Sequence, residues 1–244
     1  MPTAVITGAS KGIGRAIALR LSPQYDIVAL ARTEGALRSL GAEIAAKGGR
    51  CTAIGVDLRD PAAIATALDG VHADVLVNNA GVLHKKPFID LTPTEWAEMM
   101  DVNVNAIYHA THAVLPGMIA KGAGHVINIS SIAGRSIMLG GSGYNATKHA
   151  VQALSECLML EVRDYGVKVS MVMPGSVATE LSPGGSKVDW ALRPDDVAET
   201  VAQILSMPAN ALTFISFIAA EHFPIWAPPG GTSGVARHAI KHLI

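Results

Sequence analysis

The sequence contains few of the residues that stabilise secreted proteins or attract nucleic acids. Its two cysteines, Cys51 and Cys157, lie far apart, so no disulfide framework is expected, although two cysteines can pair in principle. Charged residues make up 16% of the chain and the formal net charge is −1, so no basic surface is expected to attract a polyanion. We therefore expect no nucleic acid as a partner.

Long apolar runs are also missing. The longest, residues 211–220, is too short to cross a bilayer and resembles a buried strand. The chain runs from Met1 and Pro2 directly into a strand and a glycine-rich loop, which leaves no room for a signal peptide. The sequence therefore predicts a cytoplasmic protein with no membrane partner.

Metal-ligand clusters are absent from the sequence pattern, although the chain has nine histidines. The pairs His109/His112 and His238/His242 have helical spacing, but no acidic or thiolate cluster accompanies them. Both pairs are interpreted as packed or solvated helix faces, and no metal site is predicted.

Apolar residues are abundant, at 50% of the 244 residues, which is enough to fill the core of a single α/β domain over residues 1–244. Strand-like runs cover residues 3–7, 26–31, 51–56, 74–78, 125–130 and 168–173. Helix-like segments cover residues 13–21, 34–47, 62–68, 93–120 and 144–165. This alternation predicts a doubly wound parallel α/β sheet of about seven strands with helices on both faces.

Three local signals refine this outline. Thr92-Pro93-Thr94-Glu95 has the pattern of a capping box with proline at the first helical position, which predicts a helix start. Residues 180–193 form an irregular stretch with Trp190 near its end, and we expect them to be a substrate loop. Residues 221–244 form an irregular, Pro/Gly-rich tail.

Tyr144 and Lys148 are spaced to share one face of a helix, with Ser131 upstream. A tyrosine with an ordinary pKa near 10 is a poor base at neutral pH, and an adjacent ammonium favours the phenolate. This pattern predicts proton transfer on or off a carbonyl oxygen. The alternative is that Tyr144 packs at a helix start and Lys148 is solvated.

The segment Thr7-Gly8-Ala9-Ser10-Lys11-Gly12-Ile13-Gly14 follows the first strand and opens the first helix. Glycines allow the backbone to approach a pyrophosphate, and the helix N-terminus offers N–H groups to it. The segment therefore predicts a phosphate-binding loop, with a tight strand-to-helix turn as the alternative.

These motifs together resemble the short-chain dehydrogenase/reductase family in its non-extended form. The resemblance rests on T-G-x-x-x-G-x-G at Thr7, on Asn78-Asn79-Ala80-Gly81, Asn103, Asn128-Ile129-Ser130-Ser131, Tyr144/Lys148 and Pro174-Gly175, in family order over roughly residues 3–206. It implies a Rossmann-like fold and a nicotinamide dinucleotide cofactor.

The resemblance also implies a role for each matching residue. The phosphates would be lined by Gly8, Ser10, Gly12, Ile13 and Gly14, and the adenine would meet Asp57. Asn79, Ala80 and Gly81 would run beside the adenine ribose, and Pro174, Gly175, Val177 and Thr179 would hold the nicotinamide end. Lys11 and Leu58 would also belong to the cofactor site. Structural alternatives remain open, since Asp57 can cap the next turn and Pro174-Gly175 can simply end a strand.

Four residues would carry the chemistry in such a protein. Tyr144 would be the general acid/base, and Lys148 would lower the pKa of Tyr144 and bind the nicotinamide ribose. Ser131 would hold the substrate oxygen. Asn103 would support a water chain that carries protons. Asn103 has the alternative of bonding nearby backbone. Ser130 is the rival to Ser131, but it is expected to point to the opposite face of the strand.

The end of the second strand favours NADP over NAD. Relatives that use NAD have an acidic residue there, whereas this chain has Ala31 followed by Arg32, and Lys11 adds a second positive charge. Glu34 is expected to fall past the strand end. The alternative is that Arg32 is a solvated loop residue.

The sequence therefore predicts an NADP-dependent oxidoreductase that acts on a small-molecule carbonyl or secondary alcohol and forms a homo-dimer or homo-tetramer. A 3-oxoacyl thioester reductase is the alternative substrate assignment, although the glycine-rich Asp-Gly-Gly ending typical of those reductases is missing. An NADP(H) sensor or scaffold without turnover is the alternative of another class. His84-Lys85-Lys86 would either favour an anionic substrate or form a solvated turn.

Overall fold

The computed structural model describes residues 1–181, 191–208 and 215–218. The predicted tail with His238 and His242, and most of the predicted substrate loop with Trp190, lie outside these ranges. Among the described residues, no helix is both long and apolar enough to cross a membrane.

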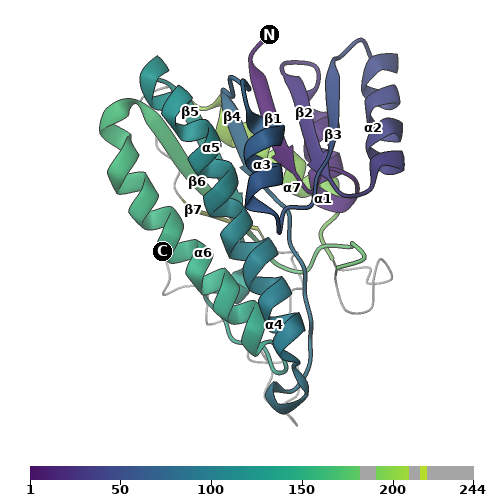
Figure 1. The fold of residues 1–244 in the computed structure, drawn as a ribbon, viewed down its shortest axis with the longest axis vertical. Coiled ribbons are helices and arrows are strands. Elements are labelled where there is room, and N and C mark those ends of the chain that lie inside the picture. The colour runs from purple at the N-terminus through teal and green to yellow at the C-terminus, as the bar shows by residue number, and fades with distance from the viewer. Residues whose placement is uncertain (182–190, 209–214, 219–244) are drawn as a thin grey trace.

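The described strands form one seven-stranded parallel sheet in the order β3-β2-β1-β4-β5-β6-β7 (Figure 1). The strands are β1 (Thr3–Thr7), β2 (Asp26–Ala31), β3 (Cys51–Gly55), β4 (Val75–Asn78), β5 (Gly124–Ile129), β6 (Val167–Pro174) and β7 (Ile215–Ile218). The predicted doubly wound parallel sheet is confirmed, and β7 lies inside the apolar run 211–220.

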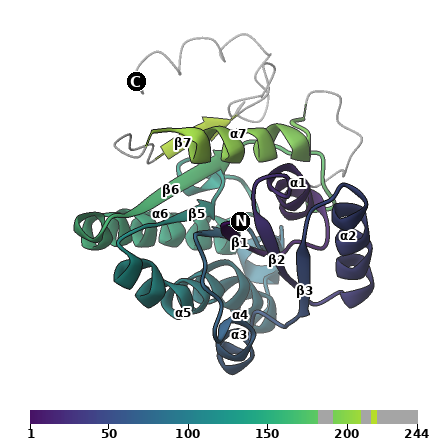
Figure 2. The ribbon, with the colours of Figure 1, turned by 90° about the horizontal axis from the view of Figure 1, so that it is seen from above.

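Helices cover both faces of the sheet (Figure 2). One face carries α1 (Gly12–Leu21), α2 (Glu34–Ala46) and α7 (Pro194–Ser206). The other carries α3 (Pro61–Leu68), α5 (Ala106–Lys121) and α6 (Ser142–Val162), with α4 (Pro93–Met100) leading into α5.

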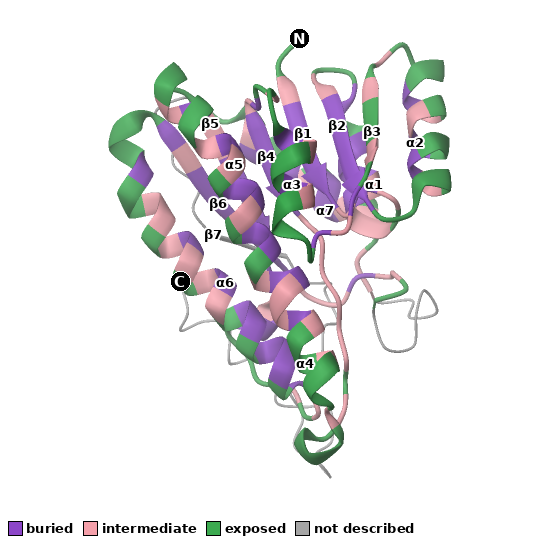
Figure 3. Ribbon diagram, in the orientation of Figure 1, coloured by how far each residue is buried: buried purple, intermediate pink, exposed green. Residues whose placement is uncertain are grey.

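Most residues of the central strands are buried (Figure 3), and a separate apolar cluster fills each side of the sheet. Val5 and Ile6 are adjacent on β1 but belong to different clusters, because successive strand side chains point to opposite faces. Ile6 packs on the side of α1, α2 and α7, and Val5 packs on the side of α3, α5 and α6. The continuous apolar runs of the sequence thus reflect strands buried on both faces.

The chain order reverses between β1 and β4, and Thr7 joins the carboxyl ends of these two strands. Its hydroxyl oxygen accepts from the backbone N–H of Asn79 at 3.0 Å and from that of Ala80 at 3.1 Å. The Asn79 side chain returns a hydrogen bond to the Thr7 carbonyl at 3.0 Å. In open α/β sheets, ligands bind beyond the carboxyl ends of the strands at such a reversal.

The region predicted as one helix over residues 93–120 begins as expected but is not continuous. Thr92 accepts from the Glu95 backbone at 3.2 Å, and the Glu95 carboxylate accepts from the Thr92 backbone at 3.1 Å, so the predicted capping box is confirmed. A π-helical turn at Asp101–Asn105 then separates α4 from α5, with the Ala106 N–H bonded to the Asp101 carbonyl. Such wide turns often accompany functional sites.

Candidate active site

Tyr144 and Lys148 on α6 form the centre of the site. Both side chains are buried, and Nζ of Lys148 lies 5.6 Å from the centre of the Tyr144 ring. The ammonium donates to the carbonyl oxygen of Ile129, the last residue of β5, at 3.1 Å. The two side chains therefore share one face, as their spacing predicts, and the lysine is not solvated.

Burial determines the proton affinities of this pair. It raises the pKa of Tyr144 to about 12, while a hydrogen bond with Ser131 opposes that shift in part. Burial also lowers the pKa of Lys148 to about 8. The expectation of a Tyr144 pKa near neutrality is wrong for this structure, because burial disfavours the phenolate and raises the pKa. Near neutral pH, Tyr144 keeps its proton and is placed to donate it.

Ser131, rather than Ser130, is the serine next to Tyr144. Ser131 follows β5 and caps a short 3-10 helix, Ile132–Gly134, by accepting from the Ala133 N–H at 3.1 Å. Its hydroxyl also takes part in the hydrogen bond with Tyr144. Ser130 is buried, and its hydroxyl has no hydrogen-bond partner in the structure.

Asn103 lies in the π turn and is completely buried. Its amide oxygen accepts from the Val82 N–H at 2.8 Å, and its amide nitrogen donates to the Val82 carbonyl at 2.9 Å and to the Thr147 hydroxyl at 3.1 Å. Thr147 donates in turn to the Tyr144 carbonyl at 2.8 Å. The side chain thus joins the loop after β4 to the helix of Tyr144, and a part in a water chain stays a prediction.

Asn145, directly after Tyr144, is a site residue that the sequence did not identify. Its amide nitrogen donates to the carbonyls of Ala133 and Ser136, each at 2.7 Å, and its oxygen accepts from the Met138 N–H at 3.2 Å. These bonds fasten the loop after Ser131 to α6. The one available signal was an amide inside a helix, where a buried polar side chain needs partners.

The glycine loop is shaped to receive an anion. Gly8 has a φ of +67°, which favours glycine, and α1 begins at Gly12 without a side-chain cap, so its first N–H groups are available to an anion. A Cβ on Gly14 would lie 2.4 Å from the Asn79 side chain and from the Gly8 carbonyl. The loop therefore packs directly against the Asn79 segment, and bulkier residues would fill the cradle.

The end of β2 carries the arrangement expected from the sequence. Ala31 is buried and Arg32, the next residue, is exposed. Glu34 is the first residue of α2 and so falls past the strand end as predicted; its carboxylate pairs with Arg38 at 3.1 Å and lies close to Gly55, the residue of β3 that pairs with Ala31.

Asp57, after β3, has a partner that the sequence did not predict. Its carboxylate accepts from the Arg59 side chain at 2.5 Å and from the Arg59 N–H at 3.0 Å, so the alternative of a turn cap is what the structure shows. The Arg59 guanidinium, with a smaller effect from Arg32, lowers the pKa of Asp57 to about 2. Leu58 is buried beside it.

The segment after β6 lies against the glycine loop. A Cβ on Gly12 would meet the Thr179 side chain at 3.4 Å, and the exposed Lys11 ammonium pairs with the Glu180 carboxylate. The stretch assigned by resemblance to the phosphates therefore adjoins the stretch assigned to the nicotinamide end.

Backbone pairing holds that segment. Pro174 ends β6, and the buried Val177 pairs with Leu192 in an isolated parallel bridge after Gly175. Ala178 donates to the Leu192 carbonyl at 2.8 Å. The segment is thus tied to residues just before α7.

The sequence matches a family model that is described as short chain dehydrogenase, over residues 2–187. The chain belongs to the short-chain dehydrogenase/reductase family. Oxidoreductase UcpA of Escherichia coli K12 is 32% identical over 211 residues, which cover 84% of this chain and 80% of that protein. The class of activity is therefore oxidoreduction.

Solved structures of family members have the same fold as this chain. A metagenomic short-chain oxidoreductase in complex with NADP has a TM-score of 0.80 and 38% identity, covering 89% of this chain and 96% of its own. An alcohol dehydrogenase from the archaeon Thermococcus sibiricus, complexed with 5-hydroxy-NADP, has a TM-score of 0.84 and 29% identity. The match covers 91% of this chain and 97% of that one. The Rossmann-like fold implied by the resemblance is confirmed.

His84 and Lys86, in the loop after β4, each lie beside a carboxylate. Nε2 of His84 lies 2.8 Å from the Glu98 carboxylate, and Nζ of Lys86 lies 2.5 Å from that of Glu95. The Lys86 ammonium, as the largest cause, lowers the pKa of Glu95 to about 2. These pairs weaken the predicted attraction for an anionic substrate.

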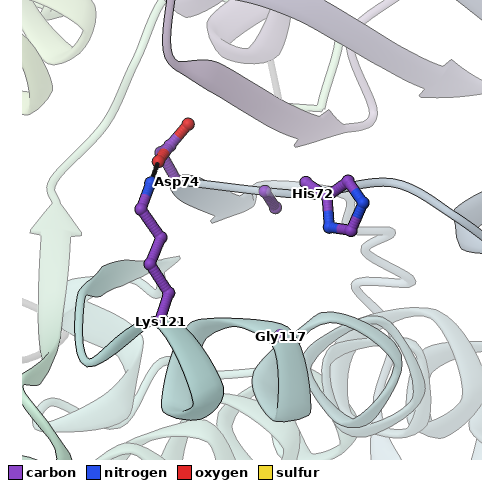
Figure 4. A pocket seen from close by; sticks show the side chains of 5 residues that line it. His72, Asp74, Gly117 and Lys121 are labelled. Carbon is purple, nitrogen blue, oxygen red and sulfur yellow. Dashed lines mark hydrogen bonds and ion pairs between the residues drawn. The ribbon is translucent and has the colours of Figure 1, made fainter.

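A hollow elsewhere in the molecule does not serve the site. It is lined by His72, Ala73, Asp74, Gly117 and Lys121 (Figure 4). Its volume of ≈ 180 Å³ is smaller than the roughly 300–1,000 Å³ of ligand pockets. Asp74 pairs there with Lys121 and accepts from the Thr3 N–H at 2.7 Å, so it ties together the starts of β1 and β4. Among the described residues, no group of three or more histidine, cysteine or acidic side chains could hold a metal ion.

Proposed function

We propose that the protein is an NADP-dependent oxidoreductase that transfers a hydride between the nicotinamide and a carbonyl or secondary alcohol, with Tyr144 as general acid/base. The observation that carries the proposal is a buried, protonated Tyr144 that shares hydrogen bonding with Ser131 and lies beside Lys148. A proton donor held this way suits an oxygen that gains negative charge during reduction.

The residues present fit the cofactor. Gly8 and Gly14 let the loop pack tightly against Asn79 and Ala80, and the uncapped start of α1 would offer N–H groups to a pyrophosphate, with the Thr179 segment adjoining at Gly12. Lys148 would bind the nicotinamide ribose. When bound, NADPH would supply the hydride.

Arg32 and Lys11 support the choice of NADP over NAD. Both side chains are exposed and positively charged, with the Lys11 ammonium paired to Glu180, and residue 31 is an alanine rather than an acid that would repel a 2′-phosphate. Glu34, the nearest acid in sequence, is already paired with Arg38.

The chain's own residues account for the proton. A carbonyl carbon that accepts a hydride forms a C–H bond and passes the electron pair of its C=O bond to oxygen. Ser131 would hold that oxygen, Tyr144 would give it a proton to complete the alcohol, and the Lys148 charge would stabilise the phenolate left behind.

The other predicted properties extend this proposal. Exposed apolar side chains on the outer helices, such as Tyr108 on α5 and Leu160 on α6, support a homo-dimer or homo-tetramer. A cytoplasmic location stays a prediction.

The test is NADPH oxidation, followed by absorbance, with a panel of ketones, aldehydes, diketones and oxoacyl thioesters. We expect Tyr144→Phe to lower kcat by roughly 10²–10⁴-fold with similar NADPH affinity, whereas Tyr165→Phe, a change at an exposed tyrosine, leaves kcat unchanged. NADPH binding without turnover on any substrate would instead support the sensor alternative. Full activity in Tyr144→Phe would sink the assigned role.

A further inference from the structure

The Tyr144 ring packs among apolar side chains. It belongs to a small buried cluster with Met99 and Ala133. Partly buried apolar side chains pack against that cluster from two loops: Val82, Leu83 and Leu91 from the loop after β4, and Met138 from the loop after β5. No member of this cluster carries a charge.

These two loops form one surface. The Lys86 N–H donates to the Gly140 carbonyl at 2.8 Å, and a Cβ on Gly140 would lie 3.4 Å from the Lys86 carbonyl carbon. Asn145, next to Tyr144, holds the Met138 backbone at 3.2 Å. The loop surface is therefore fixed to the helix that carries the proton donor.

Large apolar side chains extend outward from the same loops. Phe88 is 76% exposed, Ile89 91%, Ile137 70% and Leu139 91%. Two of these residues stand on each of the joined loops. Exposed apolar side chains that gather on two joined loops are typical of a binding surface. We call these four residues the apolar rim.

The charged residues of the two loops do not form a surface of one sign that would attract an ionic substrate. His84 and Lys86 are engaged by Glu98 and Glu95. The exposed charges on the loops have both signs: Lys85, Asp90 and Arg135.

We propose that the substrate is a neutral, lipophilic ketone or aldehyde whose apolar body lies against Leu83 and Met138 and continues onto the apolar rim. This inference rests on the proposed carbonyl reduction and specifies its substrate class. The carbonyl would meet Tyr144 and Ser131, while the hydrocarbon part is removed from water by the cluster and then by the rim. Each methylene so buried should improve binding in the transition state.

The experiment measures kcat/KM with NADPH for straight-chain methyl ketones from butanone to decanone. We expect a rise of about three- to fourfold per added methylene, the factor that corresponds to burial of one CH₂ group. The double variant Ile137→Ser/Leu139→Ser should lower kcat/KM for decanone more than for butanone. Leu160→Ser, which alters an exposed leucine on α6, is the matched control and should leave the chain-length dependence intact.

The outcomes separate the two proposals. Reduction of short and long ketones with equal kcat/KM, or an unchanged chain-length dependence in Ile137→Ser/Leu139→Ser, overturns the lipophilic substrate while leaving carbonyl reduction standing. Faster reduction of a ketone with a terminal carboxylate than of its neutral analogue of equal length also overturns it. Failure to reduce any ketone or aldehyde overturns the proposed function itself. Circular dichroism of each variant shows that the fold is retained.

Discussion

The amide nitrogen of Asn145 lies 2.7 Å from the carbonyl oxygen of Ala133, and this bond joins the helix of Tyr144 to the loop that begins at Ser131. The two groups assigned to the substrate oxygen therefore depend on one asparagine for their relative position. Because the same amide also holds Ser136 and Met138, it determines the path of the loop as well.

Asn145→Ala removes these three hydrogen bonds and leaves buried backbone groups without partners. We expect the free energy of unfolding to fall by roughly 1–3 kcal/mol and the KM for the carbonyl substrate to rise. Urea denaturation and steady-state kinetics measure the two effects. Asn105→Ala, at an exposed asparagine bonded only to Asp101 at 2.9 Å, is the control and should change stability by less than about 0.5 kcal/mol. Equal effects of the two changes would contradict the positioning role.

Gly14 and Gly41 give opposite predictions for the same substitution to alanine. A Cβ at Gly14 would lie 2.4 Å from the Asn79 side chain, so Gly14→Ala should lower stability by roughly 1–3 kcal/mol and weaken NADPH binding. Gly41 is inside α2 with no atom within 4 Å of the position of its Cβ, so Gly41→Ala should raise stability by up to about 1 kcal/mol. Thermal unfolding with and without NADPH tests both. Unimpaired NADPH binding in Gly14→Ala would rule out the proposed cradle.

The buried lysine predicts a particular pH dependence. The pKa of Lys148 is lowered to about 8, so the ammonium is present below that pH and is lost as the pH rises through it. Tyr144, with its pKa at about 12, remains protonated over the same range. The value of kcat/KM for carbonyl reduction should therefore be level near neutrality and fall above about pH 8, as read from a pH profile of the free enzyme. A profile that rises through this region would show that the lysine charge is not needed.

Arg32 is expected to distinguish the two nicotinamide cofactors. Arg32→Ala should weaken NADPH binding by roughly 10–100-fold, the loss expected for a charge-assisted hydrogen bond, and leave NADH binding nearly unchanged. Arg163→Ala, which alters an exposed arginine just after α6, is the control. Fluorescence titration with both cofactors provides the measurement. An equal loss of affinity for NADPH and NADH would mean that Arg32 does not contact the 2′-phosphate.

The sequence predicted the sheet well because its signals are local. Strands such as β1 and β2 are apolar runs bounded by turn residues, and their observed limits match the predicted ones. The π turn was missed, because a widening of the helix over Asp101–Asn105 is too short to alter the apolar periodicity of the flanking segments.

The site was harder to predict wherever a partner is distant in the chain or solvent is excluded. The bonds from Asn145 to the loop before it depend on how that loop folds back. The turn cap formed by Asp57 and Arg59 was one of two open alternatives. The pKa of Tyr144 was predicted in the wrong direction, since the spacing of Tyr144 and Lys148 shows their proximity but not the burial that dominates both.

The π turn between α4 and α5 also fixes the number of residues that this segment must contain. Each residue of an α-helix advances the chain by about 100° around its axis, so removing one residue from Asp101–Asn105 would rotate α5 by that angle relative to α4. Either Met99 or the buried face of α5 that includes Ala110 and Val114 would then turn away from its packing partners. The segment therefore cannot change its residue count without misaligning a helix on which the core depends, even where a substitution at its exposed residue, Asn105, would be accepted.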